Sequence, residues 1–571
     1  MNNIKKHKTA SLNGRKRACL TKVHVIKVKN LLRFDTDYQR LYEQFSWGLP
    51  DNFNIGRALS ERWAKQTPDA PAIVFKGNNG VVQNVSFSQL DRMANRFANY
   101  LTSIGVRRGD RVALVLPQIP QTAALHIAIY KMGAIAVPMA MLFGADGLSY
   151  RFENSGAKAV IFTPPSRDKI FDAKKGNDGL DLILSIGSSE EVGDQVSDIE
   201  RQSATCSDVF ETLDTKLDDP ALMIYTSGTT GPPKGALHGH RVLLGHLPGV
   251  QFAHEFFPQD GDMMWTPADW AWAGGLLNVM MPALYFGKPV VAHKFDKFDA
   301  KQAWDLLAEL PIRNVFIPPT ALKIMRLETP DNIADKVFLR TIFSGGEAVG
   351  AQLQSWAKDK LGLHINEVYG QTECNLVLES CDKLRVLKHG AIGKPVPGAI
   401  VGIVDDEGNE LDVGASGNIA VKRPHPVMFL EYWGNPQATK DKYVGDWLMT
   451  GDQGFVDSEG YFHFVGRDDD IITSSGYRIG PGEIEDCLLG HEAVKLVAVV
   501  GKPDELRTEI VVAFVVLADG VEASAELADD IQQHVRNKLS AHEYPRQVIF
   551  KSALPMTTTG KIIRRVLREA F

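Results

Sequence analysis

The sequence predicts an α/β protein with a large N-terminal domain of layered α/β subdomains and a small, mobile α+β domain at its C-terminal end. Three observations lead to this class. The chain has 571 residues, which is too many for a single hydrophobic core. Helix-like and strand-like patterns alternate from residue 86 onward. The composition then changes near residues 465–485, which predicts a second domain beyond that point.

The alternation starts with a helix pattern at residues 86–105, SFSQLDRMANRFANYLTSIG, whose apolar residues fall on one helical face. Ser86 or Ser88 is a suitable N-cap and Gly105 a suitable stop. The apolar run RVALVLP at residues 111–117 is typical of a buried parallel strand. One further helix pattern and three strand patterns follow, at residues 121–133, 134–139, 156–162 and 311–319 respectively.

Two later regions suggest how the chain is divided. Residues 164–219 are rich in Asp, Ser and Gly, which indicates an excursion between subdomains. About a hundred residues at the C-terminal end carry strand patterns at 494–501 and 509–517 and a helix pattern from about Ala525, enough for a small domain. We therefore expect a basic, disordered extension at 1–35, an N-terminal domain at 36–468 and a mobile C-terminal domain at 469–571.

Charge and cysteine content exclude several classes of protein. The net charge of −6 gives no reason to expect a nucleic-acid partner, and the longest apolar runs are too short to span a bilayer. The five cysteines are few and scattered and include no C-x-x-C pair. We therefore expect no disulfide framework and no structural zinc, and we favour a reducing cytoplasmic location.

The first 34 residues differ from the rest, with seven Lys, three Arg and no acidic residue. Three interpretations fit this segment. It is a disordered basic arm or a misassigned start, a transit segment that would direct the chain to the mitochondrial matrix, or an arm that binds a surface. Its use of Lys more than Arg is unusual for a transit segment.

A loop poor in core-forming residues follows the apolar run ALMIY that ends at Tyr225. Backbone N–H groups and hydroxyls in such a loop can surround an anion, which makes phosphate the candidate ligand. The P-loop pattern is excluded because Lys234 is followed by glycine rather than by Ser or Thr. On these residues alone a flexible surface turn stays the alternative. If the loop holds phosphate, the residues that we expect to contact it are Thr226, Ser227, Gly228, Thr229, Thr230 and Gly231.

The loop YTSGTTGPPKG resembles the signature of the adenylate-forming (AMP-binding) superfamily, and further motifs of that superfamily follow in order. FSGGEAVG at residues 343–350 resembles its adenine-binding turn, and EVYGQTE at 367–373 its aromatic-Gly-x-Thr-Glu strand end. The ribose, hinge and lysine motifs have counterparts in MTGDQG, VGRDDDIITSSGYRIGPGEIE and LPMTTTGKIIRR. The resemblance covers residues 36–571 and is nearest to the medium-chain acyl-CoA synthetases.

The resemblance implies a two-step reaction in which a carboxylate attacks the α-phosphorus of ATP and a thiol then displaces AMP. Because both reactants of the first step are anions, the site must neutralise charge and align the two groups. Lys234 would supply a mobile cation. Mg²⁺ would bridge phosphate oxygens, with Glu373 as its carboxylate ligand. No tightly bound prosthetic group is implied.

The same resemblance assigns the nucleotide contacts. Asp452 would accept hydrogen bonds from the ribose hydroxyls, and Arg467 and Arg478 would contact ribose or the α-phosphate. Tyr369 would stack on the base. The remaining adenine and nucleotide contacts would come from Gly346, Glu347, Ala348 and Thr372.

Three residues of the C-terminal domain take part in the catalytic cycle in this interpretation. Lys561 would enter the site during adenylation and bridge the carboxylate and the α-phosphate. The thioester step must remove this lysine, and Asp469 is the expected pivot of that rotation. Gly476 would then allow the pantetheine arm of coenzyme A to approach closely.

Two sequence positions suggest the size of the acid. Relatives specific for acetate carry tryptophan at the place of Gly370, so glycine there predicts a more open acyl pocket. Trp272 is followed by the small residues Ala273 and Gly274, which leave room for a longer chain. We therefore expect a medium-chain, branched or aromatic acid, although Trp265, Trp270 and Trp272 fit the core equally well.

Coenzyme A is the favoured acceptor, and other functions stay open. An adenylating enzyme that loads a carrier protein is one alternative, and Asp269 keeps an amino-acid substrate possible as a minor option. A non-catalytic nucleotide-binding protein on this fold is another, against which the presence of Lys561, Glu373, Asp452 and Lys234 counts. A homodimer is compatible with the sequence, but nothing in it specifies the oligomeric state.

Overall fold

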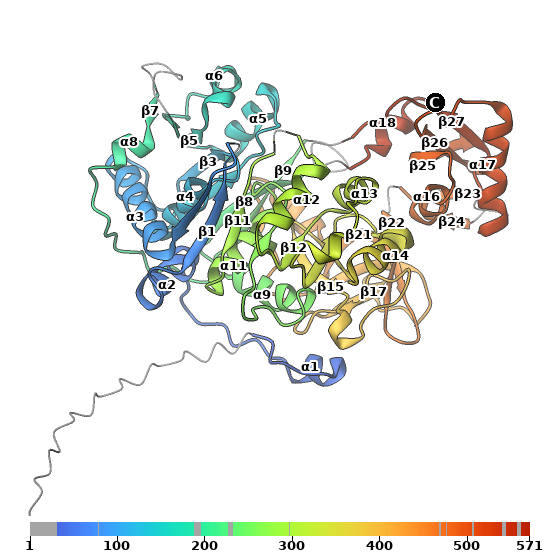
Figure 1. The fold of residues 1–571 in the computed structure, drawn as a ribbon, viewed down its shortest axis with the longest axis horizontal. Coiled ribbons are helices and arrows are strands. Elements are labelled where there is room, and N and C mark those ends of the chain that lie inside the picture. The colour runs from blue at the N-terminus through green and yellow to red at the C-terminus, as the bar shows by residue number, and fades with distance from the viewer. Residues whose placement is uncertain are drawn as a thin grey trace, which may run out of the picture.

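The computed structural model describes ten stretches of the chain: residues 31–77, 79–187, 196–226, 232–295, 297–467, 470–474, 477–504, 507–539, 544–556 and 561–571. Two large sheets with their helices and one smaller sheet make up the N-terminal part. A further sheet with its own helices lies to one side of them, at the red end of the chain in Figure 1. The α/β class with a large and a small part is as the sequence predicts.

The first large sheet has eight strands in the order β19-β9-β8-β4-β3-β5-β6-β7. The strands from β8 to β7 run parallel, and β9 and β19 are antiparallel additions at one edge. Their bounds are β3 (Arg111–Val115), β4 (Ile135–Pro138), β5 (Ala159–Phe162), β6 (Leu182–Ser185), β7 (Ser197–Asp198), β8 (Pro220–Thr226), β9 (Lys234–Gly239) and β19 (Glu431–Tyr432).

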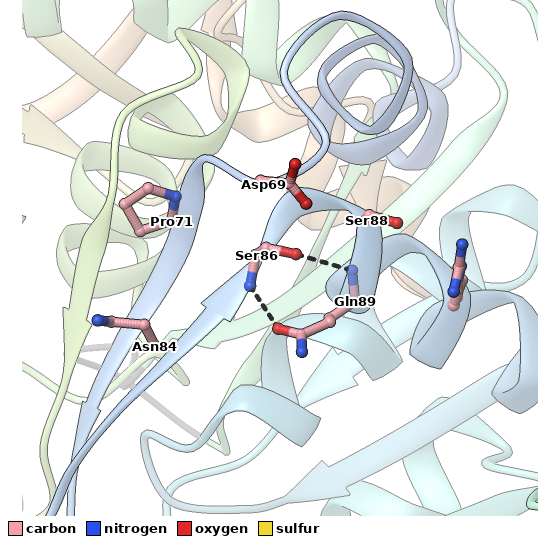
Figure 2. A pocket seen from close by; sticks show the side chains of 7 residues that line it. Asp69, Pro71, Asn84, Ser86, Ser88 and Gln89 are labelled. Atoms are coloured by element: carbon pink, nitrogen blue, oxygen red, sulfur yellow. Dashed lines mark hydrogen bonds between the residues drawn. The ribbon is translucent and has the colours of Figure 1, made fainter.

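The first helix pattern is confirmed as α3 (Phe87–Ser103), and its start is defined by Ser86. The Ser86 hydroxyl accepts a hydrogen bond from the Gln89 amide, and the Gln89 side chain accepts one from the Ser86 amide, as Figure 2 shows. This reciprocal pair satisfies two donors that a helix start leaves open, and it selects Ser86 over Ser88 as the cap. Neighbouring helices are α4 (Pro120–Lys131), α5 (Ala145–Ser155), η2 (Pro164–Ser166), α6 (Arg167–Lys174), α8 (Ile199–Ser203) and α9 (Arg241–Ala253).

The prediction that residues 164–219 form an excursion between subdomains is wrong for much of that region. Strands β6 and β7 extend the parallel sheet at its edge, and α6 packs beside them. β6 has only three apolar residues, Leu182, Ile183 and Leu184, before Ser185, and the last two of them are buried. So short a strand between polar residues shows no hydrophobic periodicity over a longer stretch of sequence.

The second large sheet has nine strands in the order β16-β15-β14-β13-β12-β10-β11-β1-β2. Its middle strands are parallel, and β2, β15 and β16 are antiparallel at the two edges. The bounds are β1 (Pro71–Lys76), β2 (Val82–Ser86), β10 (Met264–Trp265), β11 (Val290–Ala292), β12 (Asn314–Phe316), β13 (Thr341–Gly345), β14 (Ile365–Gln371), β15 (Cys374–Glu379) and β16 (Lys394–Pro395).

The largest hydrophobic core lies between the two large sheets, because strands of both sheets and helices α3, α4 and α9 contribute to it. A second core covers the other face of the nine-stranded sheet, under α12, α13 and α14. Other helices of these layers are α1 (Tyr38–Gln44), η1 (Arg57–Glu61), α2 (Arg62–Gln66), α10 (Ala273–Gly275), η3 (Leu276–Met280), α11 (Met281–Tyr285), α12 (Ala300–Glu309), α13 (Pro319–Leu327), η4 (Ile333–Asp335), α14 (Gly350–Leu361) and η5 (Asp382–Leu384).

An antiparallel five-stranded sheet follows, with β21 pairing with β18, β20 and β22. It brings residues from distant motifs into register, including Asp452 opposite Arg467. Its elements are β17 (Val401–Val404), β18 (Gly417–Lys422), α15 (Pro436–Asp441), β20 (Tyr443–Val444), β21 (Trp447–Val456) and β22 (Phe462–Arg467).

The C-terminal part has a five-stranded sheet and a hydrophobic core of its own. The predicted strands and helix are present as β25, β26 and α17, and β25 and β26 form a long antiparallel pair. The boundary predicted between residues 468 and 469 falls outside the described residues and stays a prediction. The elements are β23 (Ile472–Ser474), β24 (Tyr477–Ile479), α16 (Pro481–Leu489), β25 (Val494–Asp504), β26 (Thr508–Leu517), α17 (Ala525–Lys538), β27 (Gln547–Phe550) and α18 (Arg564–Arg568).

Candidate active site

Asp452 lies at the centre of a polar cluster where the small antiparallel sheet meets the end of β14. Its Oδ2 accepts hydrogen bonds from the Tyr369 hydroxyl at 2.6 Å and from the Gln371 side-chain amide at 3.0 Å. Arg467 Nε lies 3.9 Å from the other carboxylate oxygen. Burial raises the pKa of Asp452, and the Tyr369 hydrogen bond and the Arg467 charge oppose that shift. The carboxylate is therefore held in one orientation.

Gln371 is a member of this cluster that sequence reasoning missed. Its amide nitrogen also donates to the Thr450 carbonyl oxygen at 2.7 Å, and its amide oxygen accepts from the ammonium of Lys442 at 3.3 Å. The signal was available, because Gln371 stands inside the motif EVYGQTE between Tyr369 and Thr372. Thr372 lies in the turn between β14 and β15, beside this cluster in the chain.

Lys561 reaches the same region from the C-terminal part. Its ammonium nitrogen lies 3.5 Å from the position that a Cβ on Gly346 would occupy. Although the side chain keeps contact with solvent, desolvation lowers its pKa; the charge of Glu347, and more weakly that of Asp452, opposes the shift. The structure thus brings residues of the lysine, adenine-turn and ribose motifs close together, and their roles stay predictions.

The residues of the adenine-turn motif directly follow β13. Gly346 has φ +92°, a conformation that glycine adopts without strain. Glu347 accepts a hydrogen bond from the Thr320 hydroxyl at 3.1 Å, which fixes its carboxylate near the start of α13. Ala348 completes the turn before α14. Their contacts with adenine stay a prediction.

Glu373 and Lys234 both lie beside Tyr432, one at its hydroxyl and the other near its ring. The Tyr432 hydroxyl donates a hydrogen bond to Glu373 Oε1, and Glu373 is buried. Lys234 Nζ lies 5.2 Å from the centroid of the Tyr432 ring. Burial and the neighbouring carboxylate raise the pKa of Tyr432 well above its ordinary value, so the phenol stays a donor. Sequence reasoning missed Tyr432, which belongs to none of the motifs.

The ends of the phosphate loop lie side by side in the structure. Thr226 is the last residue of β8 and pairs with Lys234, the first residue of β9. The loop residues Ser227, Gly228, Thr229, Thr230 and Gly231 lie outside the described residues, as do Asp469 and Gly476 and the side chain of Arg478. Their roles remain predictions.

The predicted acyl wall is only partly as expected. Trp265 and Trp270 are buried core residues, whereas Trp272, Ala273 and Gly274 keep some exposure. Trp272 packs edge-on against Phe143, with ring centroids 5.9 Å apart.

The expectation that Gly370 and Gly274 leave open space is wrong in this structure. A Cβ at Gly370 would lie 2.6 Å from the backbone nitrogen of Leu376, and one at Gly274 would lie 2.6 Å from the ring of Phe316. Both glycines therefore serve close packing, since the chain or a side chain already fills the space that a larger residue would take.

The carboxylate of Glu373 is the one protein ligand that we assign to Mg²⁺, as the sequence suggested. Within the described residues, His, Cys, Asp and Glu side chains form no group of three or more that could hold a metal ion. Mg²⁺ is commonly bound through one or two carboxylates with phosphate and water as the other ligands. Glu373 fits that pattern as a single protein ligand.

Two other regions contribute nothing to this site. A hollow of about 490 Å³ lies at the start of α3, lined by Asp69, Asn84, Ser88 and Arg92 among others (Figure 2), and none of the predicted site residues borders it. Asp269 accepts a hydrogen bond from the Ala271 amide at 3.0 Å, and burial raises its pKa to about 6. Its side chain therefore caps a local turn.

A layered α/β body, a separate small domain and a lysine brought onto an adenine-turn motif define a nucleotide-dependent, adenylate-forming class of enzyme. The comparisons agree with that class. The family described as AMP-binding enzyme matches residues 60–433, and the AMP-binding enzyme C-terminal domain matches residues 483–561. The chain belongs to this AMP-binding family.

Relatives match over nearly the whole chain. Mouse acyl-coenzyme A synthetase ACSM3, mitochondrial, is 33% identical over 552 residues, covering 94% of this chain and 93% of the relative. The acetyl-coenzyme A synthetase of Bacillus subtilis is 32% identical over 550 residues, covering 93% and 94%. Among solved structures, the anthranilate CoA ligase AuaEII in complex with anthranoyl-AMP has a TM-score of 0.82 at 28% identity, covering 91% of this chain and 98% of the other.

The protein is accordingly an AMP-forming acid–CoA ligase by class, and enzymes of this class use ATP and coenzyme A as substrates. Across the described part of the chain, every helix is too short or too polar to traverse a bilayer.

Proposed function

We propose that this enzyme activates a medium-chain, branched or aromatic carboxylic acid as its acyl-adenylate and transfers the acyl group to coenzyme A. The observation that supports adenylation most directly is the position of Lys561 beside Gly346, Glu347 and Asp452. A cation there can neutralise the carboxylate and the α-phosphate as they meet. Asp452, oriented by Tyr369 and Gln371, would hold the ribose.

The triphosphate would lie toward Lys234 and Glu373, which both lie beside Tyr432. Lys234 would neutralise phosphate oxygens, and Glu373 would hold Mg²⁺, which supplies charge to the phosphates when bound. The loop from Thr226 to Gly231 would contribute hydroxyl and backbone donors. Arg467, paired with Asp452, would contact ribose or the α-phosphate.

The size of the acid rests on fewer observations than the adenylation step. Ala273 is small and partly exposed next to Trp272, which supports a pocket with room beyond acetate. Gly370 and Gly274 no longer support it, because their surroundings are filled. The anthranilate ligase acts on an aromatic acid, whereas the Bacillus relative is named for acetate. The chain-length preference is therefore the property to measure first.

The test is pyrophosphate release from ATP and Mg²⁺ with acetate, butyrate, hexanoate, octanoate and benzoate, each with and without coenzyme A. Turnover that requires coenzyme A and is greatest with an acid longer than acetate is the expected result. A preference for acetate would refute the acid class. Adenylate without thioester would point to a carrier-protein acceptor, and ATP binding without turnover would point to a non-catalytic protein.

The thioester step and the location are further parts of the proposal. Asp469 would be the hinge and Gly476 would face the pantetheine arm, so Asp469→Pro should block thioester formation while adenylation survives. The location would be cytoplasmic, or the mitochondrial matrix if residues 1–34 act as a transit segment. Fusing those residues to a fluorescent protein distinguishes the two locations. Sedimentation velocity tests the homodimer.

A further inference from the structure

Lys561 can act only if the segment that carries it is held in place. The residues after it are fixed to the preceding strand region, because Met556 and Ile562 form a β-bridge and the Ile563 amide donates to the Pro555 carbonyl at 2.8 Å. Helix α18 begins at Arg564, three residues after Lys561. Whatever anchors α18 therefore also sets the position of the lysine.

Two arginines of α18, one turn apart, both reach the same carboxylate. Arg564 Nη1 lies 3.5 Å from Asp470 Oδ2, and Arg568 Nη1 lies 3.0 Å from Asp470 Oδ1. The Asp470 side chain is only 11% exposed. Ion pairs shielded from solvent in this way are screened by salt much less than pairs on an open surface, and loss of one partner leaves a charge without compensation.

Arg564 is held by a second carboxylate. Its guanidinium donates from Nη2 to both oxygens of Glu485, at 2.8 and 2.7 Å, and from Nε at 3.2 Å. Glu485 lies in α16 and also accepts from the Val499 amide at 2.8 Å. Glu485 therefore ties α18 to the body of the C-terminal domain. The contacts of Asp470 with α18 are additional to this connection.

Asp470 connects α18 to the nucleotide side of the site. Its amide, like that of Ile471, donates to the carbonyl oxygen of Arg467, at 2.9 and 3.0 Å. Arg467 in turn pairs with Asp452 across β21 and β22. A continuous set of contacts therefore runs from Asp452 through Arg467 and Asp470 to α18, and so back to Lys561.

We propose that Asp470 is a positioning residue for the adenylation step, which holds Lys561 at the site through Arg564 and Arg568. This inference rests on the function proposed above. The position of Asp470, one residue after the expected pivot, suggests a competing role in the hinge. The two roles differ in the half-reaction that they serve: positioning of Lys561 supports adenylation, whereas a hinge supports thioester formation.

The test is Asp470→Asn in the full-length enzyme, with both half-reactions measured separately. Adenylation is followed by pyrophosphate–ATP exchange, and thioester formation by adding coenzyme A to a synthetic acyl-adenylate. We expect kcat of exchange to fall roughly 10- to 100-fold, since a displacement of about 1 Å has effects of that order. The KM for ATP and the rate of the thioester step should stay close to those of the wild type, because the loss concerns an interaction made in the adenylation transition state.

A double variant separates positioning from a general structural defect. If Asp470 acts through Lys561, then Asp470→Asn should add nothing to the loss already caused by Lys561→Ala. Glu569→Gln is the matched control, because Glu569 pairs with Arg565 on the same helix and both side chains are largely exposed. This control should leave both half-reactions unchanged.

Each other result would overturn the inference. Equal loss of both half-reactions would show a structural role, and loss of thioester formation alone would show a hinge role. Additive effects with Lys561→Ala would exclude action through the lysine. If the wild type shows exchange and Asp470→Asn has the same exchange rate, the inference alone is refuted. If the wild type shows no exchange with any acid, the proposed function is refuted and this inference with it.

Discussion

The hydroxyl of Tyr432 donates a hydrogen bond to the buried carboxylate of Glu373. The same ring lies 5.2 Å from the ammonium of Lys234, so one side chain contacts both charged groups that we assign to the triphosphate. Because the phenol stays protonated, it can only orient the carboxylate and cannot compete with it for a cation. Tyr432 thus fixes the geometry between a predicted metal ligand and a predicted phosphate ligand.

Tyr432→Phe should lower the rate of adenylation about 10-fold, because a hydrogen bond to a charged group contributes about 1.5–3 kcal/mol. The Mg²⁺ concentration for half-maximal activity should rise, since Glu373 loses the donor that orients it. Pyrophosphate–ATP exchange across a Mg²⁺ titration measures both effects. Tyr42→Phe is the control, because it removes a tyrosine hydroxyl bonded to the Ala399 carbonyl away from the site. An unchanged Mg²⁺ dependence would contradict the metal role of Glu373.

Tyr369→Phe distinguishes two roles of one ring. If Tyr369 acts only by stacking on adenine, phenylalanine keeps that contact and the KM for ATP should not change. The structure shows that its hydroxyl donates to Asp452 at 2.6 Å. We therefore expect the KM for ATP to rise roughly 10-fold with a smaller change in kcat, since an oriented ribose carboxylate loses a charge-assisted hydrogen bond. Steady-state kinetics in ATP measure this difference.

The fold could be predicted largely from periodicity, and the site largely from motifs. Helix α3 has a regular apolar face, so its type followed from the sequence, whereas the choice of Ser86 over Ser88 as its cap came from the structure. Strand β6 was missed because three apolar residues between Asp181 and Ser185 give no period. Motif order also indicated that Lys561 and Gly346 belong to one site, which the structure places together.

What the sequence could not supply were contacts between motifs. Tyr432 reaches Glu373 because β19 joins the edge of the eight-stranded sheet, a pairing between segments about two hundred residues apart in the chain. Asp470 pairs with Arg568, although almost the whole sequence of the C-terminal domain separates the two residues. A glycine likewise has no sequence signature that separates open space from close approach, and at Gly370 the structure shows close approach.

Gly370→Ala tests that distinction. Its Cβ would lie 2.6 Å from the Leu376 nitrogen, so the turn after β14 must shift. We expect a loss of stability of about 1–3 kcal/mol, the range for forced overpacking, and an unchanged order of preference among acids. Chemical denaturation and the acid panel measure the two properties. Full stability with a shift toward shorter acids would instead support an open acyl pocket at this position.

Six buried histidines predict sensitivity to acid. Burial lowers the pKa of His126, His238 and His425 to about 3 and that of His240 and His246 to about 4, and it lowers that of His254 well below its ordinary value. The unfolded chain takes up protons near pH 6.5, whereas the folded chain does not. Their contribution to stability is therefore complete above pH 6.5 and is lost as the pH falls toward 4.

Relative to its value well above pH 6.5, the free energy of unfolding at pH 5.5 should be lower by about 1.4 kcal/mol for each of these histidines, or roughly 8 kcal/mol for all six. Thermal unfolding between pH 7.5 and 5.5 should show a steep fall in Tm. His246→Gln should reduce the slope by one proton, whereas His364→Gln, at a partly exposed position, should not. A Tm that stays constant across this range would contradict the assignment of neutral buried imidazoles.

Glu367 predicts an opposite dependence at higher pH. Burial and, more weakly, the charge of Asp486 from the C-terminal domain together raise its pKa to about 8, against the opposing hydrogen bond from the Val349 amide. Asp486, a residue of α16, packs against the first turn of α14. Its Oδ1 is 2.8 Å from the position that a Cβ on Gly350 would occupy. Two carboxylates from different domains therefore lie near enough to influence each other, and the charge of Lys323 favours the charged form of Asp486.

Because the folded chain keeps the Glu367 proton up to about pH 8 and the unfolded chain loses it near 4.5, stability is complete at low pH and falls as the pH rises through that interval. Between pH 7 and 8 the loss should be about 1.4 kcal/mol or less per unit. Glu367→Gln mimics the protonated form, so its Tm should vary less with pH over this window, while Glu328→Gln on an exposed residue should behave as the wild type. The adenylation rate should likewise vary less with pH in Glu367→Gln than in the wild type and Glu328→Gln. The reason is that an ionised Glu367 repels Asp486 and disfavours the domain orientation that brings Lys561 to the site. Identical pH profiles for Glu367→Gln and the wild type would show that this carboxyl is already ionised at neutral pH and that Asp486 docks against it by another interaction.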